Sequence, residues 1–222
     1  MCGRFTLTSA EGLAERFNII EDFLPEQLNI SYNVAPGQPV LSVIHTGSER
    51  RMGHLRWGFI PRWAKEEKIG YKMINARAET LAEKPSFKKP LQTQRCLIVT
   101  DGFYEWKKTD DKKQPYRLTL KDKGIFSFAG LWEKWQSPSG DAVFSCTIIT
   151  TKANEVMQDI HHRMPVIIAQ EDESAWLDPE NSRKPEELLL PFPSDHMDIY
   201  PVSAAVNNAK NNSPDLIQPV GQ

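Results

Sequence analysis

The sequence predicts an α+β fold: a single mixed domain over residues 1–222, with a largely antiparallel, barrel-like β core and short peripheral helices. Three observations predict it. Short apolar segments typical of strands recur along the chain between polar turns, whereas segments with helical periodicity are few and short. A length of 222 residues with 40% hydrophobic residues suffices for one sizeable core. Neither an internal repeat nor a linker-like segment divides the chain.

The first ninety residues alternate predicted extended segments with loops. Residues 2–7 form a short strand, and Thr8 with Glu11 matches a capping box that opens a helix, with Leu13 and Phe17 on one face. The extended segments expected next are 32–37, 40–44, 55–60 and 73–77, and residues 84–90 are expected to be loop.

The remaining chain is also dominated by predicted strands. The apolar run 95–100 predicts a buried strand that turns at Asp101-Gly102 into residues 103–106. Further strands are expected at 115–120, 125–132, 142–150, 166–168 and 199–202, and short helices at 152–158, 171–177 and 185–190.

Charge and cysteine content limit the classes of function. Lys and Arg number 27 against 29 Asp and Glu, a net charge of −2, so any anion-binding surface must be a local patch. Cys96 and Cys146 lie in apolar runs that predict buried, unreactive thiols and a reducing compartment. There is no amino-terminal apolar segment of the secretory type and no run of 18 apolar residues. We therefore expect a cytoplasmic protein without a membrane span.

The start Met1-Cys2-Gly3-Arg4 offers unusual cysteine chemistry. An initiator methionine is usually removed before a small residue, so the mature chain is expected to begin with Cys2. Its α-amine titrates near about 7.7–8.0 and its thiol near about 8.5, so both have a nucleophilic fraction at neutral pH. A 1,2-aminothiol forms an imine with an aldehyde, and the thiol then closes a thiazolidine ring. The expected target is an aldehyde.

A small second residue is common, so Cys2 alone is a weak indicator of catalysis. Gly3 permits close approach of a substrate, because it lacks a Cβ. Arg4 predicts a lowered thiol pKa or a contact with a substrate phosphate. The alternative is that Arg4 is a solvated strand residue.

Glu105 lies between Tyr104 and Trp106, an apolar setting that favours a raised carboxyl pKa and general acid–base work. The alternative is a surface carboxylate between aromatic residues.

His161 and His162 directly precede a predicted buried strand. Adjacent side chains of an extended segment face opposite ways, so only one of them is expected to address a given site. A metal site is the alternative, but the other histidines lie in unrelated contexts, so we expect no metal. The sequence also lacks phosphate-binding and dinucleotide motifs, and no cofactor is expected.

Several ordered motifs extend over nearly the whole chain. They are Met-Cys-Gly-Arg-Phe at 1–5, Tyr-Asn-Val-Ala-Pro at 32–36, Trp-Gly at 57–58, Asn-Ala-Arg at 75–77, Gly-Phe-Tyr-Glu-Trp at 102–106, Ile-His-His-Arg-Met-Pro at 160–165 and Pro-Val-Ser at 201–203. With these motifs the chain resembles the SOS-response-associated peptidase (SRAP) family. Residues 19–30 and 179–196 match nothing in that pattern.

The resemblance implies a mixed fold with a β core and a covalent sensor of abasic sites in single-stranded DNA. It further implies a monomer without metal or membrane contact, cytoplasmic and associated with the nucleoid when crosslinked. Position by position, the matches are Cys2 as the crosslinking residue, Asn75, Glu105 and His161 as its active-site partners, Arg4 and Arg77 as phosphate contacts, and Asn33 and Trp63 as lining of the nucleic-acid cleft.

The aldehyde chemistry of Cys2 agrees with this resemblance, because a ring-opened abasic deoxyribose carries an aldehyde at C1′ between two phosphates. His161 would assist ring opening, Glu105 would shuttle protons and Asn75 would orient the nucleophile. Elimination of the 3′ phosphate, an AP lyase reaction, is the competing outcome. Three alternatives stay open: an amino-terminal-nucleophile amidohydrolase, a cysteine peptidase that acts on its own Met1, and a non-enzymatic DNA-binding module.

Overall fold

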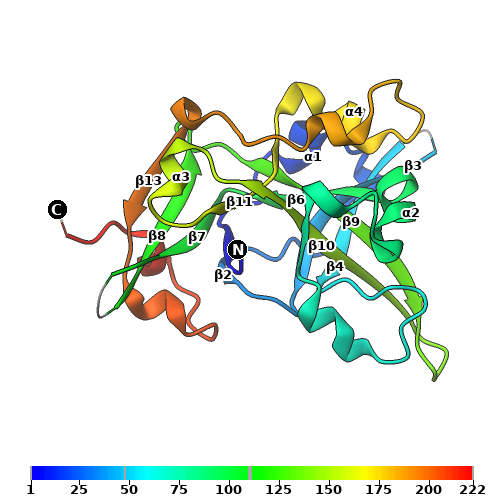
Figure 1. Cartoon of the computed structure of the whole chain (residues 1–222), viewed down its shortest axis with the longest axis horizontal. Helices are drawn as coiled ribbons and strands as arrows, with labels where there is room; N and C mark the ends of the chain where they lie inside the picture. Colours follow the sequence, from blue (N-terminus) through cyan, green and yellow to red (C-terminus); the bar gives the residue numbers. More distant parts are fainter. Residues whose placement is uncertain (1, 48, 110–111, 222) are drawn as a thin grey trace.

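Two β-sheets organise the chain, and short helices lie at their periphery (Figure 1). The computed structural model describes residues 2–47, 49–109 and 112–221. Its strands are β1 (Phe5–Leu7), β2 (Ser31–Val34), β3 (Pro39–Thr46), β4 (Glu49–Trp57), β5 (Asn75–Arg77), β6 (Arg95–Thr100), β7 (Gly102–Lys108), β8 (Lys113–Leu120), β9 (Phe126–Gln136), β10 (Ala142–Lys152), β11 (Arg163–Pro165), β12 (Ile167–Ile168) and β13 (Met197–Pro201).

The helical segments are all short. The α-helices are α1 (Leu13–Phe17), α2 (Pro85–Thr93), α3 (Glu155–Gln158) and α4 (Glu173–Leu177). The 3₁₀ segments are η1 (Glu21–Phe23), η2 (Glu67–Lys72), η3 (Ala78–Thr80), η4 (Gln170–Asp172), η5 (Pro185–Leu188), η6 (Ser194–His196), η7 (Ala204–Asn207) and η8 (Pro214–Ile217). Among the residues described, no helix combines the length and apolarity needed to cross a membrane.

The larger sheet closes on itself. Its strands follow the order β11-β10-β4-β3-β6-β9-β12, and β9 also pairs with β10, so β10, β4, β3, β6 and β9 form a closed ring. Among the strands of the described residues, only the pairings of β10 with β4 and with β5 are parallel. The predicted α+β class with a largely antiparallel, barrel-like core is therefore confirmed.

The smaller sheet places the amino terminus. Its order is β13-β8-β7-β1-β2, so β1 lies between β2 and β7. The pairing continues one residue before β1, because the Tyr104 amide donates to the Arg4 carbonyl oxygen at 3.0 Å. The chain start is thereby fixed beside β7, the strand that carries Glu105.

One apolar cluster joins the two sheets. Phe5 of β1 and Phe103 of β7 both pack edge-on against Phe128 of β9, with ring centroids 5.8 and 5.7 Å apart. Cys96 and Cys146 lie in the same cluster and are fully buried, which confirms the interpretation of these thiols as core residues. Burial of such aromatic rings is a major stabilising contribution.

The predicted loop at residues 84–90 is wrong, because α2 begins there. Pro85 occupies the first helical turn, where its missing N–H has no intrahelical partner in any case. Phe87 and Leu91, four residues apart, then share the buried face of the helix. Pro85 therefore marks the start of a helix rather than a loop.

The predicted capping box at Thr8 is also wrong. The Thr8 hydroxyl donates instead to the Asp101 carboxylate at 2.5 Å, and α1 begins only after Gly12. The expected burial of Leu13 and Phe17 on one face of this helix is confirmed.

Candidate active site

Cys2 lies just ahead of β1 and is fully buried within the cluster that joins the sheets. Its main-chain oxygen accepts a hydrogen bond from Asn75 Nδ2 at 2.8 Å. Asn75 opens β5, which runs parallel to β10 with Asn75 opposite Ile148. The fold thus joins two residues that are 73 positions apart, and the Asn75 amide fixes the backbone of the candidate nucleophile.

The Cys2 thiol differs from the sequence-based expectation. Burial, together with the charge of Glu105, raises the pKa of the Cys2 thiol. The Arg4 main-chain oxygen accepts from the thiol at 3.8 Å, which lowers this pKa in part. The Arg4 guanidinium donates to Asn33 Oδ1 at 2.7 Å and to the Val206 carbonyl at 2.8 Å. The net direction is a raised thiol pKa, in contrast to the lowered pKa that was one of the two roles expected for Arg4.

Glu105 lies on β7, two residues beyond Phe103, which pairs with Phe5 at the start of β1. The side chain is 3% exposed, and burial raises the pKa of its carboxyl group. The expected raised pKa is confirmed. A carboxyl group of this kind exchanges protons at a higher pH than an exposed one, which suits general acid–base work.

His161 lies between α3 and β11, with its ring half-buried. Its Nδ1 accepts the backbone N–H of Arg163 at 3.0 Å, and burial lowers the pKa of the imidazole. A neutral ring whose Nδ1 is an acceptor carries its proton on Nε2, so we assign that tautomer.

The two adjacent histidines do not face opposite ways. Their rings stack with centroids 4.4 Å apart and planes 22° apart. The expectation rested on an extended backbone, whereas β11 starts only at Arg163 and His162 lies in a bend. His161 lines the cavity described below, while His162 is exposed.

No pattern in the sequence indicated the ion pair that lies next to His161. The Arg163 guanidinium binds the Glu79 carboxylate through two bonds of 2.6 and 2.9 Å. The hydrogen bond from Arg163 lowers the pKa of Glu79. Since the Arg163 backbone N–H also holds His161, this pair fixes the segment that carries the imidazole. No spacing in the sequence links Glu79 to position 163.

A cavity of about 520 Å³ brings these groups together. Arg4, Glu105 and His161 line it. Cys2 is buried next to Gly3, which also lines the cavity. Three further residues that line the cavity were not predicted as site residues: Trp106, Lys113 and Asn207. Among these, Trp106 Nε1 donates a hydrogen bond to Asn207 Oδ1 at 2.7 Å. The complete lining is Gly3, Arg4, Glu105, Trp106, Lys113, His161 and Asn207.

Of the eight predicted residues, Arg4, Glu105 and His161 line this cavity, whereas Cys2, Asn75, Asn33, Arg77 and Trp63 do not. Asn33 is 1% exposed and lies behind Arg4, with its Nδ2 donating to the carbonyls of Asn208 and Asn211 at 3.1 and 2.9 Å. Arg77 is exposed at the end of β5, two residues from Asn75. Trp63 is 63% exposed on the loop after β4.

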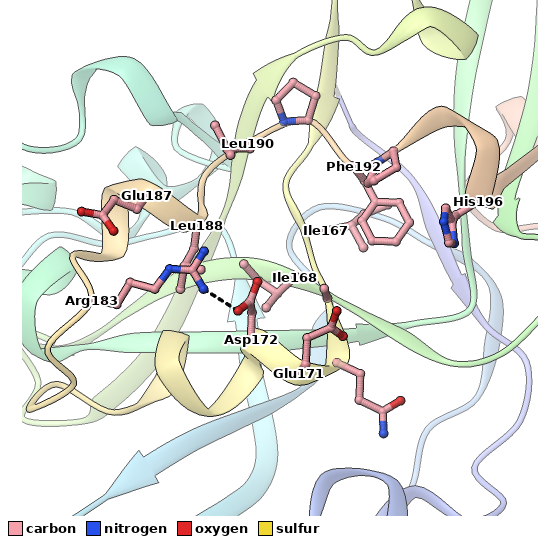
Figure 2. Close-up of a pocket in the computed structure, with 14 residues that line it drawn as sticks. Ile167, Ile168, Glu171, Asp172, Arg183, Glu187, Leu188, Leu190, Phe192 and His196 are labelled. Carbon is pink, nitrogen blue, oxygen red and sulfur yellow. Dashed lines mark hydrogen bonds and ion pairs between the residues drawn. The ribbon is translucent and has the colours of Figure 1, made fainter.

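A second cavity, of about 480 Å³, lies between the β12 region and the segment that follows α4 (Figure 2). Arg183 and Asp172 form an ion pair of 2.6 Å at its wall. None of the eight predicted site residues lines it. In the part of the chain that the structure describes, no group of three or more His, Cys, Asp or Glu side chains is arranged to hold a metal ion.

Comparisons with known proteins agree on one family. Residues 1–209 match the family model described as SOS response associated peptidase (SRAP). The chain is similar to abasic site processing protein YoqW of Bacillus subtilis, with 57% identity over 98% of this chain and 99% of the relative. It is also similar to abasic site processing protein HMCES of Pongo abelii, with 34% identity over 88% of this chain and 67% of the relative.

The fold has solved counterparts. A crystal structure of a protein from Bacteroides thetaiotaomicron superposes with a TM-score of 0.82 and 31% sequence identity, covering 98% of this chain and 99% of that chain.

Proposed function

The chain belongs to the SOS response associated peptidase (SRAP) family, and from that premise we propose that it processes abasic sites in DNA through Cys2. The observation that carries the proposal is the convergence of four side chains. Asn75 bonds the backbone of Cys2, while Glu105 and His161 line the cavity beside Gly3. These groups can position the aminothiol and move protons while it traps an aldehyde.

The reaction that we propose has two bond-forming steps after Met1 has been removed. The Cys2 α-amine attacks C1′ of the ring-opened sugar, and loss of one water gives an imine. The Cys2 sulfur then bonds to C1′, and its proton passes to the nitrogen, so that a thiazolidine ring closes. Loss of a C2′ proton from the imine, with departure of the 3′ phosphate, is the lyase outcome that ring closure prevents.

The groups at the site that can donate or accept protons support these steps. Burial raises the pKa of the Cys2 thiol, so the sulfur needs a base as it bonds to C1′. Glu105, whose carboxyl pKa is also raised, can take a proton from one group and return it to another. His161, with Nε2 protonated, can donate to the sugar ring oxygen as the ring opens.

We further propose single-stranded DNA as the substrate. Trp63, with 63% of its surface exposed, offers a face on which a base can stack, a contact worth about 1–3 kcal/mol. Arg77 is exposed two residues from Asn75 and can bind a neighbouring phosphate. Asn33 does not contact the DNA in this proposal; it positions the Arg4 guanidinium by accepting a hydrogen bond from it.

A thiol peptidase is the alternative that the same cysteine raises. Peptidase chemistry requires the thiolate, which an adjacent imidazolium or other cation normally stabilises. Here the thiol pKa is raised, the imidazole pKa is lowered, and Arg4 is engaged elsewhere. These observations favour the amine-first reaction.

The test uses untagged protein, Cys2→Ser, Cys2→Ala and a variant whose amino terminus carries an uncleavable extension. Each is incubated with single-stranded abasic DNA, with and without borohydride, and resolved on a denaturing gel. We expect a stable adduct from the unaltered protein alone, borohydride-dependent trapping by both Cys2 variants, and neither by the extended protein. A stable, unreduced adduct from Cys2→Ala would refute the assignment of the thiol to ring closure.

A further inference from the structure

The hairpin of β7 and β8 carries four lysines that the proposed reaction does not use. Lys107 and Lys108 end β7, Lys113 begins β8, and Lys112 directly precedes it. We call these four residues the lysine arm. The register places Lys108 directly opposite Lys113.

This arrangement is unfavourable in the free protein. Like charges directly opposite each other on an antiparallel pair destabilise the sheet. Among the residues described, no carboxylate forms an ion pair with any lysine of the arm. Asp110 and Asp111, which follow in the sequence, lie outside the described residues. The chain retains this repulsion between lysines although its net charge is −2. This suggests that the lysines bind a negatively charged partner.

The arm begins at the candidate active site. Lys113 lines the cavity together with Arg4, Glu105 and His161. From Glu105 to Lys108 the chain advances three residues along β7, about 10 Å at the usual rise of a strand. Figure 1 shows β7 and β8 running outward from the region of the amino terminus. Lys108 and Lys113 lie on the face of the hairpin that carries Trp106, which also lines the cavity. A strand of DNA that leaves the cavity along this face meets both lysines.

We propose that the lysine arm binds the phosphates on one side of the abasic nucleotide, with Lys108 and Lys113 closing on the same stretch of backbone. This inference rests on the proposed function, because the polyanion is taken to be the DNA strand whose abasic sugar occupies the cavity. A phosphate between the two ammonium groups removes their mutual repulsion and supplies charge-assisted hydrogen bonds.

The test is the salt dependence of binding to intact single-stranded DNA, measured by fluorescence anisotropy. Each phosphate contact contributes about 0.7 to the slope of log affinity against log salt. Lys108→Gln/Lys113→Gln should therefore lower the slope by about 0.7, because the two ammonium groups share one phosphate. Its melting temperature should equal or exceed that of the unaltered protein, because a like-charge pair has been removed.

The matched control is Lys88→Gln/Lys89→Gln, which removes the same charge from exposed positions of α2. Its slope should stay within experimental error of the unaltered protein. An unchanged slope in the arm variant, or an equal fall in both variants, would overturn the proposal. The first result would leave an acidic protein as the candidate partner, and the second would indicate a general charge effect.

Adduct formation with abasic DNA separates this inference from the proposed function. If the slope falls but unaltered protein forms no adduct at saturating DNA, the arm binds DNA and the proposed reaction fails. If the adduct forms and the slope is unchanged, the reaction stands and the arm has no part in DNA binding.

Discussion

Asn33→Ala is expected to weaken both the fold and DNA capture, although the side chain does not reach solvent. Asn33 is 1% exposed, and its Oδ1 accepts from Arg4 Nη1 at 2.7 Å. Its Nδ2 donates to the carbonyls of Asn208 and Asn211, and more weakly to Val206 at 3.3 Å. The Asn33 carboxamide therefore holds both the Arg4 guanidinium, which lines the cavity, and the chain segment 206–211.

The magnitude follows from the bonds that are lost. The bond to the charged Arg4 contributes about 1.5–3 kcal/mol, and the shared donation to carbonyls adds about 1 kcal/mol. These terms are not additive, so the free energy of unfolding should fall by about 3 kcal/mol. For a chain of this size, that loss lowers the melting temperature by about 6–12 °C.

The assay pairs thermal denaturation with the rate of adduct formation at limiting DNA. Asn29→Ala is the control, since Asn29 is exposed and its Nδ2 lies 3.5 Å from His54 Nε2, at the limit of a hydrogen bond. We expect Asn33→Ala to lose stability and to capture DNA more slowly, and Asn29→Ala to do neither. Slower capture at unchanged stability would show that Asn33 contacts DNA directly, and no change in either would refute the positioning role.

Two further predictions concern charges at the site. Burial raises the folded-state pKa of Glu105, so the stability that this carboxyl contributes is lost as pH rises through that pKa. Glu105→Gln should accordingly raise the melting temperature at neutral pH, with the gain disappearing in acid, while adduct formation slows; a gain independent of pH would contradict this. Arg77→Ala should lower the salt slope of single-strand binding by about 0.7 with little change in melting temperature, and an unchanged slope would return Arg77 to a structural role.

The elements that sequence patterns predicted are those with an unambiguous apolar period. Residues 95–100 were predicted as a buried strand and residues 142–150 as a strand, and both segments lie within strands of the closed ring. Residues 84–90 were predicted as loop, whereas α2 accommodates both Pro85 and Pro90 there through the packing of Phe87 and Leu91. Tertiary contacts decided the outcome where the local signals conflicted.

The site was predictable in its residue types but not in its electrostatics. Motifs identified Glu105, and its aromatic neighbours indicated the raised carboxyl pKa. The thiol pKa of Cys2 depends on burial between two sheets, which no local pattern reports. The carbonyl that binds Arg4 belongs to Val206, some 200 positions away, so the direction of the guanidinium could not be deduced from the sequence.

The central claim is that both the α-amine and the sulfur of Cys2 bond to C1′ of the abasic sugar. Intact-mass measurement of the adduct, before and after borohydride treatment, tests it most directly. The account predicts a mass equal to the protein without Met1 plus the DNA, less one water, and unchanged by borohydride because no imine remains. An adduct that retains Met1, or one that gains two hydrogens on reduction, would contradict it.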